Sequence, residues 1–246
     1  MEAFEYARPT SKEEAVKLLA SAWGETEVLA GGTDLLSLMK DYDTTPKRVV
    51  SLSGISALKG ISAQPGGGIR IGAMTTLQEL TSNSTVRKQY PALIEAAEGI
   101  RSPQLHSVGT VGGELLQRPR CWYFRGGHGL LAMYKGKSLV PDGENQYHAI
   151  LGNSGPAYFV SPSSFAPLLI ALGAKVKIQG LHGAWVGELA KFYRTPSRET
   201  EREYDLKPNE ILTDILVPAY SGKAAVCEVR EKEALDWPFP NINHGS

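Results

Sequence analysis

The chain has 246 residues, of which 42% are hydrophobic and 21% are charged, a composition typical of a globular protein with one large or two small domains. Lysine plus arginine and aspartate plus glutamate each number 26, so the net charge is zero and indicates neither nucleic acid nor an anionic membrane as a partner. The sequence has no apolar run near the roughly 20 residues of a membrane span and no signal-peptide pattern at its start, so we expect a cytoplasmic protein.

The first elements follow the order helix, strand, glycine turn and helix. A helix is predicted over residues 11–21, because Ser11 is followed three residues later by a glutamate and such a pair can form a capping box. Residues 26–30 are apolar and predict a short strand, which stops at the glycine pair 31–32. Residues 35–39 then open a second apolar helix.

The remaining elements indicate an α/β or α+β protein without internal repeats. Before residue 117 we predict strands at 48–52 and 68–72, a helix at 77–81 and two helices within 84–99 that are separated at Pro91. Residues 117–153 show no clear period, and structureless stretches of this length are usually functional or mobile. After them we expect regular structure at 157–160, helices at 164–172 and 187–193, and strands at 174–178, 211–217 and 224–230.

The turn at residues 31–34 has the chemistry of a phosphate site. A strand that ends in two glycines before a helix presents free backbone N–H groups, and glycine allows a phosphate to approach them closely. Thr33 adds a hydroxyl donor. The spacing is not GxGxxG, so a Rossmann site is not inferred. An ordinary turn is the alternative interpretation of Gly31-Gly32 taken alone.

A second glycine turn makes the pattern specific. Ala30–Leu36 together with Ser107–Gly113 resembles the paired signature of the flavoprotein subunits of molybdenum hydroxylases, the xanthine dehydrogenase family. Phe4–Thr10, Ile71–Thr76 and Ser102–Leu105 also resemble that family. The resemblance covers about residues 1–240. It is strongest to the branch with 4-hydroxybenzoyl-CoA reductase and periplasmic aldehyde oxidoreductase.

The resemblance implies two α/β subdomains that clasp an extended FAD, followed by a C-terminal α/β domain. We therefore expect an FAD-binding domain over residues 1–220, with subdomains at about 1–58 and 59–220 and an insertion at about 117–153. Residues 221–246 are expected to be the start of a truncated C-terminal domain, because relatives continue for several tens of residues more.

The resemblance also implies the cofactor site. In relatives the first loop wraps the pyrophosphate through backbone N–H groups, and the second turn approaches the cofactor from the second subdomain. A bulky residue at position 32 is expected to fill the space that the phosphate needs. No catalytic residue and no metal ligand is predicted. The candidate cofactor-binding residues are Val28, Leu29, Ala30, Gly31, Gly32, Thr33, Asp34, Leu35, Gly109, Thr110, Val111, Gly112, Gly113 and Ser164.

The family's function supplies the expected activity and partners. Its members are oxidoreductase subunits that accept electrons from a molybdopterin-binding large subunit through the [2Fe-2S] clusters of a small subunit and pass them to an external acceptor. A flavin suits this role because it exchanges both one and two electrons, while the protein positions and tunes it. We therefore expect a hetero-oligomer with those two subunits.

The insertion departs from one branch of the family, which carries a [4Fe-4S] cluster there. Such a cluster normally needs four thiolate ligands, and here Cys121 alone remains. The other ligand positions fall near Leu131, at Ser138 and at Ala157. We expect no cluster, an idle thiol at Cys121, and an insertion that is mobile or repacked around the aromatic residues 122–124.

Three further departures concern the flavin. Glu114 stands where relatives have Asn and brings a negative charge near the cofactor. Ser164 stands where relatives often have Asp contacting the sugar-like portion of the flavin, although a helix N-cap is its alternative role. Glu228 replaces a frequent Lys. These changes leave open a flavin-free structural subunit as a second hypothesis. A stand-alone flavoenzyme is a third, against which no obvious catalytic base, nucleophile or covalent flavin anchor is seen.

Overall fold

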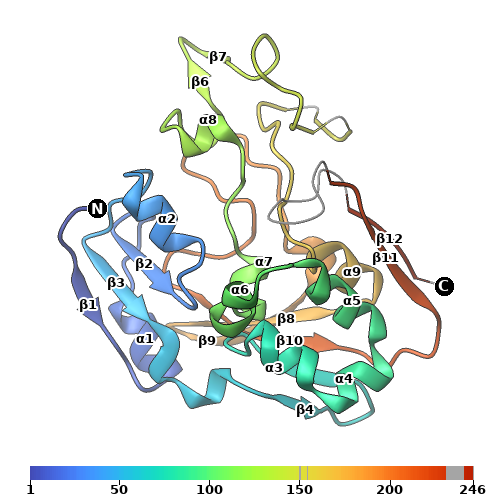
Figure 1. Ribbon diagram of the computed structural model, residues 1–246. Coiled ribbons are helices and arrows are strands. Elements are labelled where there is room, and N and C mark those ends of the chain that lie inside the picture. Colours follow the sequence, from blue (N-terminus) through green and yellow to red (C-terminus); the bar gives the residue numbers. More distant parts are fainter. Residues whose placement is uncertain (150, 154, 231–240, 246) are drawn as a thin grey trace.

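Two β-sheets carry the fold, and short helices and a long projecting insertion surround them (Figure 1). The structure is a computed structural model that describes residues 1–149, 151–153, 155–230 and 241–245. Within these residues no helix has both the length and the apolar character needed to cross a membrane.

The smaller sheet contains the N-terminal strands, which run parallel in the order β1-β3-β2. The hydroxyl of Ser11 caps the first helix by accepting the backbone N–H of Glu14 at 3.1 Å, while the Glu14 carboxylate accepts the N–H of Thr10 at 2.8 Å. These reciprocal bonds explain why the helix begins there. The elements of this region are β1 (Glu5–Ala7), α1 (Lys12–Leu18), β2 (Thr26–Leu29), α2 (Leu35–Lys40), β3 (Arg48–Ser51) and the 3₁₀ turns η1 (Leu52–Gly54) and η2 (Ser56–Leu58).

The larger sheet is antiparallel, in the order β4-β5-β10-β8-β9. Its central strand β10 comes from late in the chain and pairs with β5, so the sheet joins segments far apart in sequence. The strands are β4 (Ile61–Ala63), β5 (Ile69–Gly72), β8 (Lys175–Gly180), β9 (Gly183–Glu188) and β10 (Ile211–Val217), and the turn η3 (Leu189–Lys191) follows β9.

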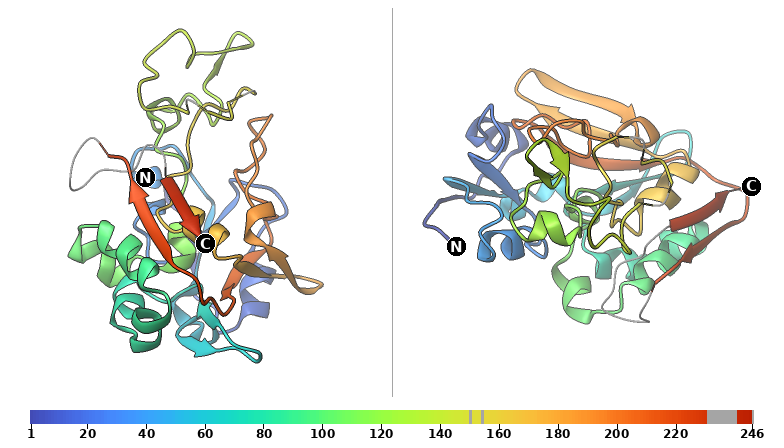
Figure 2. Two further views of the ribbon diagram at one scale, coloured as in Figure 1. Left: turned by 90° about the vertical axis from the view of Figure 1, so that its right-hand side faces the viewer. Right: turned by 90° about the horizontal axis from the view of Figure 1, so that it is seen from above.

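Helices pack on one side of this sheet and enclose the main core with it (Figure 2). Thr76 and Glu79 form a capping box at the start of α3, and Pro91 occupies the first turn of α5, where its missing N–H has no cost. The helices are α3 (Leu77–Ser82), α4 (Ser84–Gln89), α5 (Pro91–Gly99), α6 (Pro103–Val108), α7 (Val111–Leu115) and α9 (Ala166–Ala171).

The insertion projects from the body of the molecule, and a two-stranded C-terminal sheet lies beside α5 and α9 (Figures 1 and 2). The insertion holds only short elements, which are α8 (Trp122–Arg125), β6 (Met133–Tyr134) and β7 (Lys137–Ser138). The C-terminal sheet pairs β11 (Ala224–Glu228) with β12 (Asn241–Gly245).

Three clusters of buried apolar side chains follow this arrangement. The main one lies between the larger sheet and its helices, and a second lies beneath the parallel sheet. The second cluster also takes Met74 and Ile211 from outside residues 1–58, so the two sheets share part of their packing. The subdomain boundary near residue 58 stays a prediction. The third cluster belongs to the insertion and includes Leu38 from α2.

Most predicted elements are confirmed, with differences of a few residues at their ends. The α/β class is confirmed, as is the separation of α4 from α5 at Pro91. The helix predicted at 187–193 is wrong, because residues 183–188 form edge strand β9 and only a 3₁₀ turn follows. The regular structure expected at 157–160 is also wrong, since these residues form neither a helix nor a strand.

Candidate functional site

The two glycine turns pack directly against each other. A Cβ on Gly31 would overlap the backbone carbonyl of Val108, so only glycine permits this approach. Gly112 is equally constrained, because its Cβ would lie 2.8 Å from that of Ala73. Gly32 has φ +78°, and its Cβ would meet the side chains of Leu36 and Leu29. The expected effect of a bulky residue at position 32 therefore has a different basis, namely backbone strain rather than the filling of a phosphate's space.

The backbone N–H groups of the two turns differ in their availability. Within the described part of the chain, those of residues 31–35 donate to no acceptor in the protein. In the second turn the N–H groups of Val111, Gly112 and Gly113 are already used, since they donate to Thr75, Ala73 and the Thr110 hydroxyl respectively. The first turn can therefore bind an anion through its backbone, whereas the second turn offers a packing surface.

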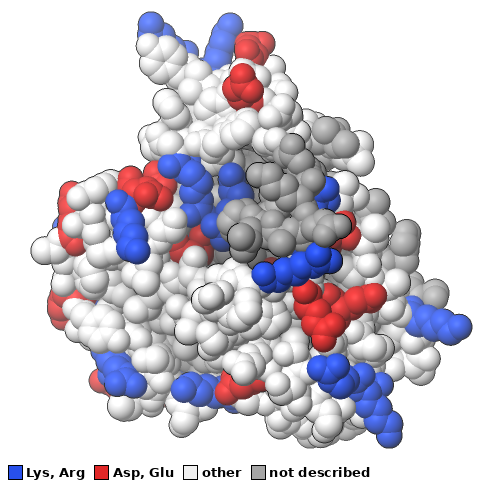
Figure 3. Space-filling view, in the orientation of Figure 1, with Lys and Arg blue, Asp and Glu red and all other residues white. Residues whose placement is uncertain are grey.

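A cleft in two lobes runs past both turns. The larger lobe has a volume of about 670 Å³ and the smaller about 210 Å³. Both lobes are bordered by the same residues of the two turns and their surroundings, so the lobes join there. Figure 3 shows basic side chains gathered where the insertion meets the body of the molecule. The residues that line both lobes are Thr33, Asp34, Thr110, Gly113 and Gln117.

The larger lobe contains an aromatic and a cationic side chain in contact. The Arg202 guanidinium lies over the Trp23 ring at 4.4 Å from its centroid, and one of its nitrogens is 3.4 Å from the Glu27 carboxylate. Burial raises the pKa of Glu27, and Arg202 opposes that shift. The buried Nε of Arg202 has no hydrogen-bond partner in the described structure. This lobe is therefore bordered by a stacked pair of an aromatic ring and a guanidinium group.

The smaller lobe is bordered by Ser164 and by the turn that carries Glu114. The Glu114 carboxyl group is turned toward the start of α9, where it accepts the Ser164 N–H at 2.7 Å. Burial raises the pKa of Glu114 to about 7, against hydrogen bonds from Ser163 and the backbone. The hydroxyl that accepts the Ala166 N–H at the start of α9 belongs to Ser163, not to Ser164. Glu228 is paired with Arg230, so neither replacement places an unpartnered carboxylate in the lobe.

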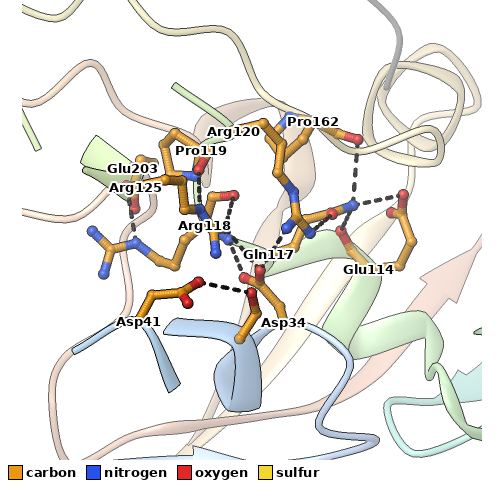
Figure 4. A network of polar contacts seen from close by, with 11 residues as sticks. Asp34, Asp41, Glu114, Gln117, Arg118, Pro119, Arg120, Arg125, Pro162 and Glu203 are labelled. Atoms are coloured by element: carbon orange, nitrogen blue, oxygen red, sulfur yellow. Dashed lines mark hydrogen bonds and ion pairs between the residues drawn. The ribbon is translucent and has the colours of Figure 1, made fainter. Parts of the chain in front are cut away.

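Asp34 joins the first turn to the insertion (Figure 4). One carboxylate oxygen lies 2.9 Å from Arg120 and 2.8 Å from Arg125, and the other accepts the Arg118 N–H at 2.8 Å. Arg118 continues the network to Glu203 at 3.1 Å. The three contacts of the Asp34 carboxylate give this side chain a structural role. They hold Asp34 in place at the point where the two lobes meet.

A small apolar cluster lies within the insertion. Phe124 is buried with Leu131 and Ala157, and the guanidinium of Arg118 lies over its ring at 4.8 Å from the centroid. Cys121 packs against the same cluster, and its sulfur lies 3.0 Å from Nε2 of His148. Burial raises the pKa of the Cys121 thiol and lowers that of His148, so it favours the neutral form of both groups. In the described residues no group of His, Cys, Asp and Glu is arranged to hold a metal ion.

Most of the predicted cofactor residues lie on the cleft. Two of them, Leu29 and Val111, do not line the cleft. Val111 is buried in the main core instead. Sequence reasoning missed the residues of the larger lobe that come from outside the two turns, because no local pattern marks them. These are Trp23, Glu27, Arg202 and Tyr204. The predicted residues on the cleft are Val28, Ala30, Gly31, Gly32, Thr33, Asp34, Leu35, Gly109, Thr110, Gly112, Gly113 and Ser164.

Comparison with known proteins agrees with this geometry. Residues 2–220 match the family described as the FAD binding domain in molybdopterin dehydrogenase. The chain is 32% identical to the aldehyde oxidoreductase FAD-binding subunit PaoB of Escherichia coli K12, over 98% of this chain and 77% of PaoB. It is 28% identical to the carbon monoxide dehydrogenase medium chain of Hydrogenophaga pseudoflava, over 95% of this chain and 66% of that protein.

Solved structures show the same fold. A carbon monoxide dehydrogenase chain from Hydrogenophaga pseudoflava matches with a TM-score of 0.71 and 26% identity, over 96% of this chain and 67% of the other. A chain of quinoline 2-oxidoreductase from Pseudomonas putida 86 matches in fold, with a TM-score of 0.73 at 21% identity, over 99% and 68%. This chain thus spans about two thirds of the length of these solved chains. It belongs to the FAD-binding flavoprotein subunits of the molybdenum hydroxylases, an oxidoreductase family.

Proposed function

We propose that the chain binds one FAD non-covalently along the two-lobed cleft. It acts as the electron-transfer subunit of a molybdopterin-dependent dehydrogenase. The observation that carries the proposal is that the two lobes meet at a turn whose backbone N–H groups are free. A dinucleotide has the matching form, with two aromatic ends joined by a pyrophosphate.

The pyrophosphate is assigned to residues 31–34. Free N–H groups in a glycine turn bind phosphate oxygens, and the Thr33 hydroxyl adds a donor. The tight packing of the second turn against Gly31 keeps the first turn in place. The remaining predicted residues on the cleft, including Leu35 and Thr110, serve as its walls. Leu29 and Val111 support the turns from the protein side.

The two ends of FAD are assigned to the two lobes. The adenosine end takes the larger lobe, which has the greater volume and is bordered by the stacked Trp23–Arg202 pair. The isoalloxazine end takes the smaller lobe, because Ser164, the counterpart of the residue that contacts the sugar-like portion in relatives, borders it. When bound there, the flavin supplies the exchange of one and two electrons.

The proposed partners follow from the proposed role. A flavin subunit needs a source of electrons, and we assign this source to a [2Fe-2S] small subunit fed by a molybdopterin-binding large subunit. An external acceptor then takes the electrons. Co-purification of the three chains from the native host is the test, and a chain that always elutes alone contradicts the hetero-oligomer.

The cofactor itself is tested by the absorbance spectrum of the purified chain and by fluorescence titration with FAD. Gly32→Ala and Gly60→Ala form a matched pair, because both glycines have φ near +80° and a Cβ on Gly60 meets nothing within 4 Å. Both variants therefore carry similar backbone strain, and Gly60 lies outside the cleft. We expect Gly32→Ala alone to lose flavin. Equal flavin content in the two variants contradicts the assigned pyrophosphate site, and no flavin in any of the three proteins contradicts FAD binding.

A further inference from the structure

Three arginines near the start of the insertion surround Asp34, the last residue of the first glycine turn (Figure 4). One Asp34 oxygen contacts Arg120 at 2.9 Å and Arg125 at 2.8 Å, and the other accepts the backbone N–H of Arg118 at 2.8 Å. The side chains of this arginine cluster are largely buried, with exposed fractions between 13% and 23%. Cations held this far from water need anions nearby, so the charges around them indicate what the cluster can bind.

Few carboxylates lie close to the arginine cluster. A second one, that of Glu203, pairs with Arg118 at 3.1 Å. Asp43 attracts Arg125 but forms no ion pair with it among the described residues. Glu27 has an arginine partner of its own in the larger lobe. In the described structure three guanidinium groups thus share two carboxylates at ion-pair distance, and an added anion is favoured there.

Two members of the cluster face the cleft where its lobes meet. Arg118 borders the larger lobe and Arg120 the smaller one, while Thr33 and Asp34 border both. Arg125 borders neither lobe. The two cations therefore lie beside the place where the first turn offers its free backbone N–H groups.

The Arg118 side chain still has donors to offer. Its Nε donates to Glu203, and among the described residues its two terminal nitrogens donate to no acceptor. The guanidinium group lies over the Phe124 ring at 4.8 Å from the centroid, which limits its movement. A planar guanidinium with two donors on one edge matches the oxygens of a phosphate group.

Arg120 prepares the turn for an anion in a different way. Its terminal nitrogens contact Asp34 at 2.9 Å and the side-chain oxygen of Gln117 at 2.8 Å. The contact with Asp34 offsets the charge of a carboxylate that would otherwise repel a phosphate at the first turn. Burial lowers the pKa of Arg120 to about 10, which leaves it cationic at neutral pH.

From this geometry we propose that the insertion supplies the cationic part of the FAD pyrophosphate site. Arg118 donates to a phosphate oxygen from the side of the larger lobe, and Arg120 keeps Asp34 from repelling the phosphate. The free N–H groups of the first turn hold the same group from the protein body. The inference rests on the proposed FAD site for the identity of the ligand, and on the contacts of the arginine cluster for the binding of an anion.

Arg118→Met and Arg125→Met form the matched test, because both arginines are largely buried and both lie over the Phe124 ring. Arg125 donates to Asp34 and to the carbonyls of Pro119 and Arg118, whereas the Arg118 side chain donates to Glu203 alone among the described residues. If the cluster only holds the protein together, Arg125→Met should therefore lose more affinity. We expect the opposite order.

The measurement is the dissociation constant of the flavin-free full-length protein for FAD and for inorganic pyrophosphate. In Arg118→Met both constants should rise by about tenfold or more, the effect of losing a hydrogen bond to a charged group, and in Arg125→Met they should rise less. Arg118→Gln, which removes the charge but keeps a donor, is the second variant if methionine is not accommodated, and the same loss is expected. An Arg118 variant that binds both ligands as well as Arg125→Met does overturns the inference.

The two proposals fail in different ways. If wild type binds pyrophosphate with this order of variants but binds no FAD, the proposed function fails and the anion site stands. If wild type binds FAD and the Arg118 variants bind it no worse than Arg125→Met, the role of the insertion fails and the proposed function stands. If wild type binds neither ligand, both fail.

Discussion

Gly31 and Val108 are in backbone contact across the interface of the two glycine turns, and a side chain at position 31 would overlap the Val108 carbonyl. The two turns therefore cannot be treated as separate motifs. The first provides free N–H groups and the second holds it in place.

Gly31→Ala is expected to separate the turns and to lower the free energy of unfolding by about 1–3 kcal/mol, the usual cost of overpacking. FAD affinity should fall as well, because the N–H groups lose their common orientation. The control is Gly155→Ala, where a Cβ meets nothing within 4 Å and φ is not positive. Chemical denaturation checks the prediction, which fails if both variants unfold alike.

Asp34→Ala should destabilise the junction between the first turn and the insertion by about 2 kcal/mol, since it leaves two arginines of one network without their carboxylate. Asp205→Ala is the matched control, because its pair with Arg194 is largely exposed and contributes little. Urea unfolding of both variants provides the measurement. If Asp34→Ala lowers the free energy of unfolding no more than Asp205→Ala does, the Asp34 network does not stabilise the junction between the first turn and the insertion.

A site residue could be predicted only where its neighbours in the sequence form a recognisable pattern. The glycine turns were predictable, because positive φ and close backbone approach both require glycine. Trp23 and Arg202 were not, since they are 179 positions apart and meet only through the fold. The polar network of Asp34 was hidden for the same reason, although the arginines it binds stand close together in the sequence.

The fold shows a similar limit. Strand β9 was not predicted, and its last two residues were assigned to a helix at 187–193, because this exposed edge strand lacks the alternation of a half-buried strand. The role of Glu114 was inferred as a charge near the cofactor, while its side chain turns into the protein toward Ser164. A residue type and its place in a motif do not give the direction of its side chain, which packing decides.

Phe124→Ala should release the insertion, because the ring forms the centre of its small apolar cluster. Removal of a buried Phe costs about 3–5 kcal/mol in a large core, and here the loss falls on a segment that projects from the body. We expect faster proteolysis within residues 117–153 and little change in the melting of the rest. The exposed Trp122 is the control for substitution by alanine. Iron and sulfide analysis of either protein should find no cluster, and stoichiometric iron would overturn that expectation.

Trp23→Ala should weaken FAD binding by about tenfold, as expected for the loss of one stacking face. Trp122→Ala is a control, since this tryptophan of the insertion lines neither lobe. Fluorescence titration with FAD, and separately with FMN, decides the point. If the larger lobe takes adenosine, the variant should lose affinity for FAD but not for FMN, which lacks that end. Equal losses would place the ring of the flavin in the larger lobe instead.

Glu114 should make the protein less stable as pH rises. The pKa of about 7 in the folded state lies above the ordinary glutamate pKa of 4.5, so the folded state holds the proton more tightly than the unfolded state. The resulting stabilisation is complete below about pH 4.5, declines as pH rises and is lost above about pH 7. The shift corresponds to about 3 kcal/mol across that window. Other acids titrate there too, so the measured quantity is the difference between wild type and Glu114→Gln in urea unfolding at each pH. This difference should change in favour of the variant as pH rises and level off above neutrality. A difference that is constant across the window would mean that the hydrogen bonds from Ser163, Ser164 and Gln117 keep Glu114 ionised in the fold.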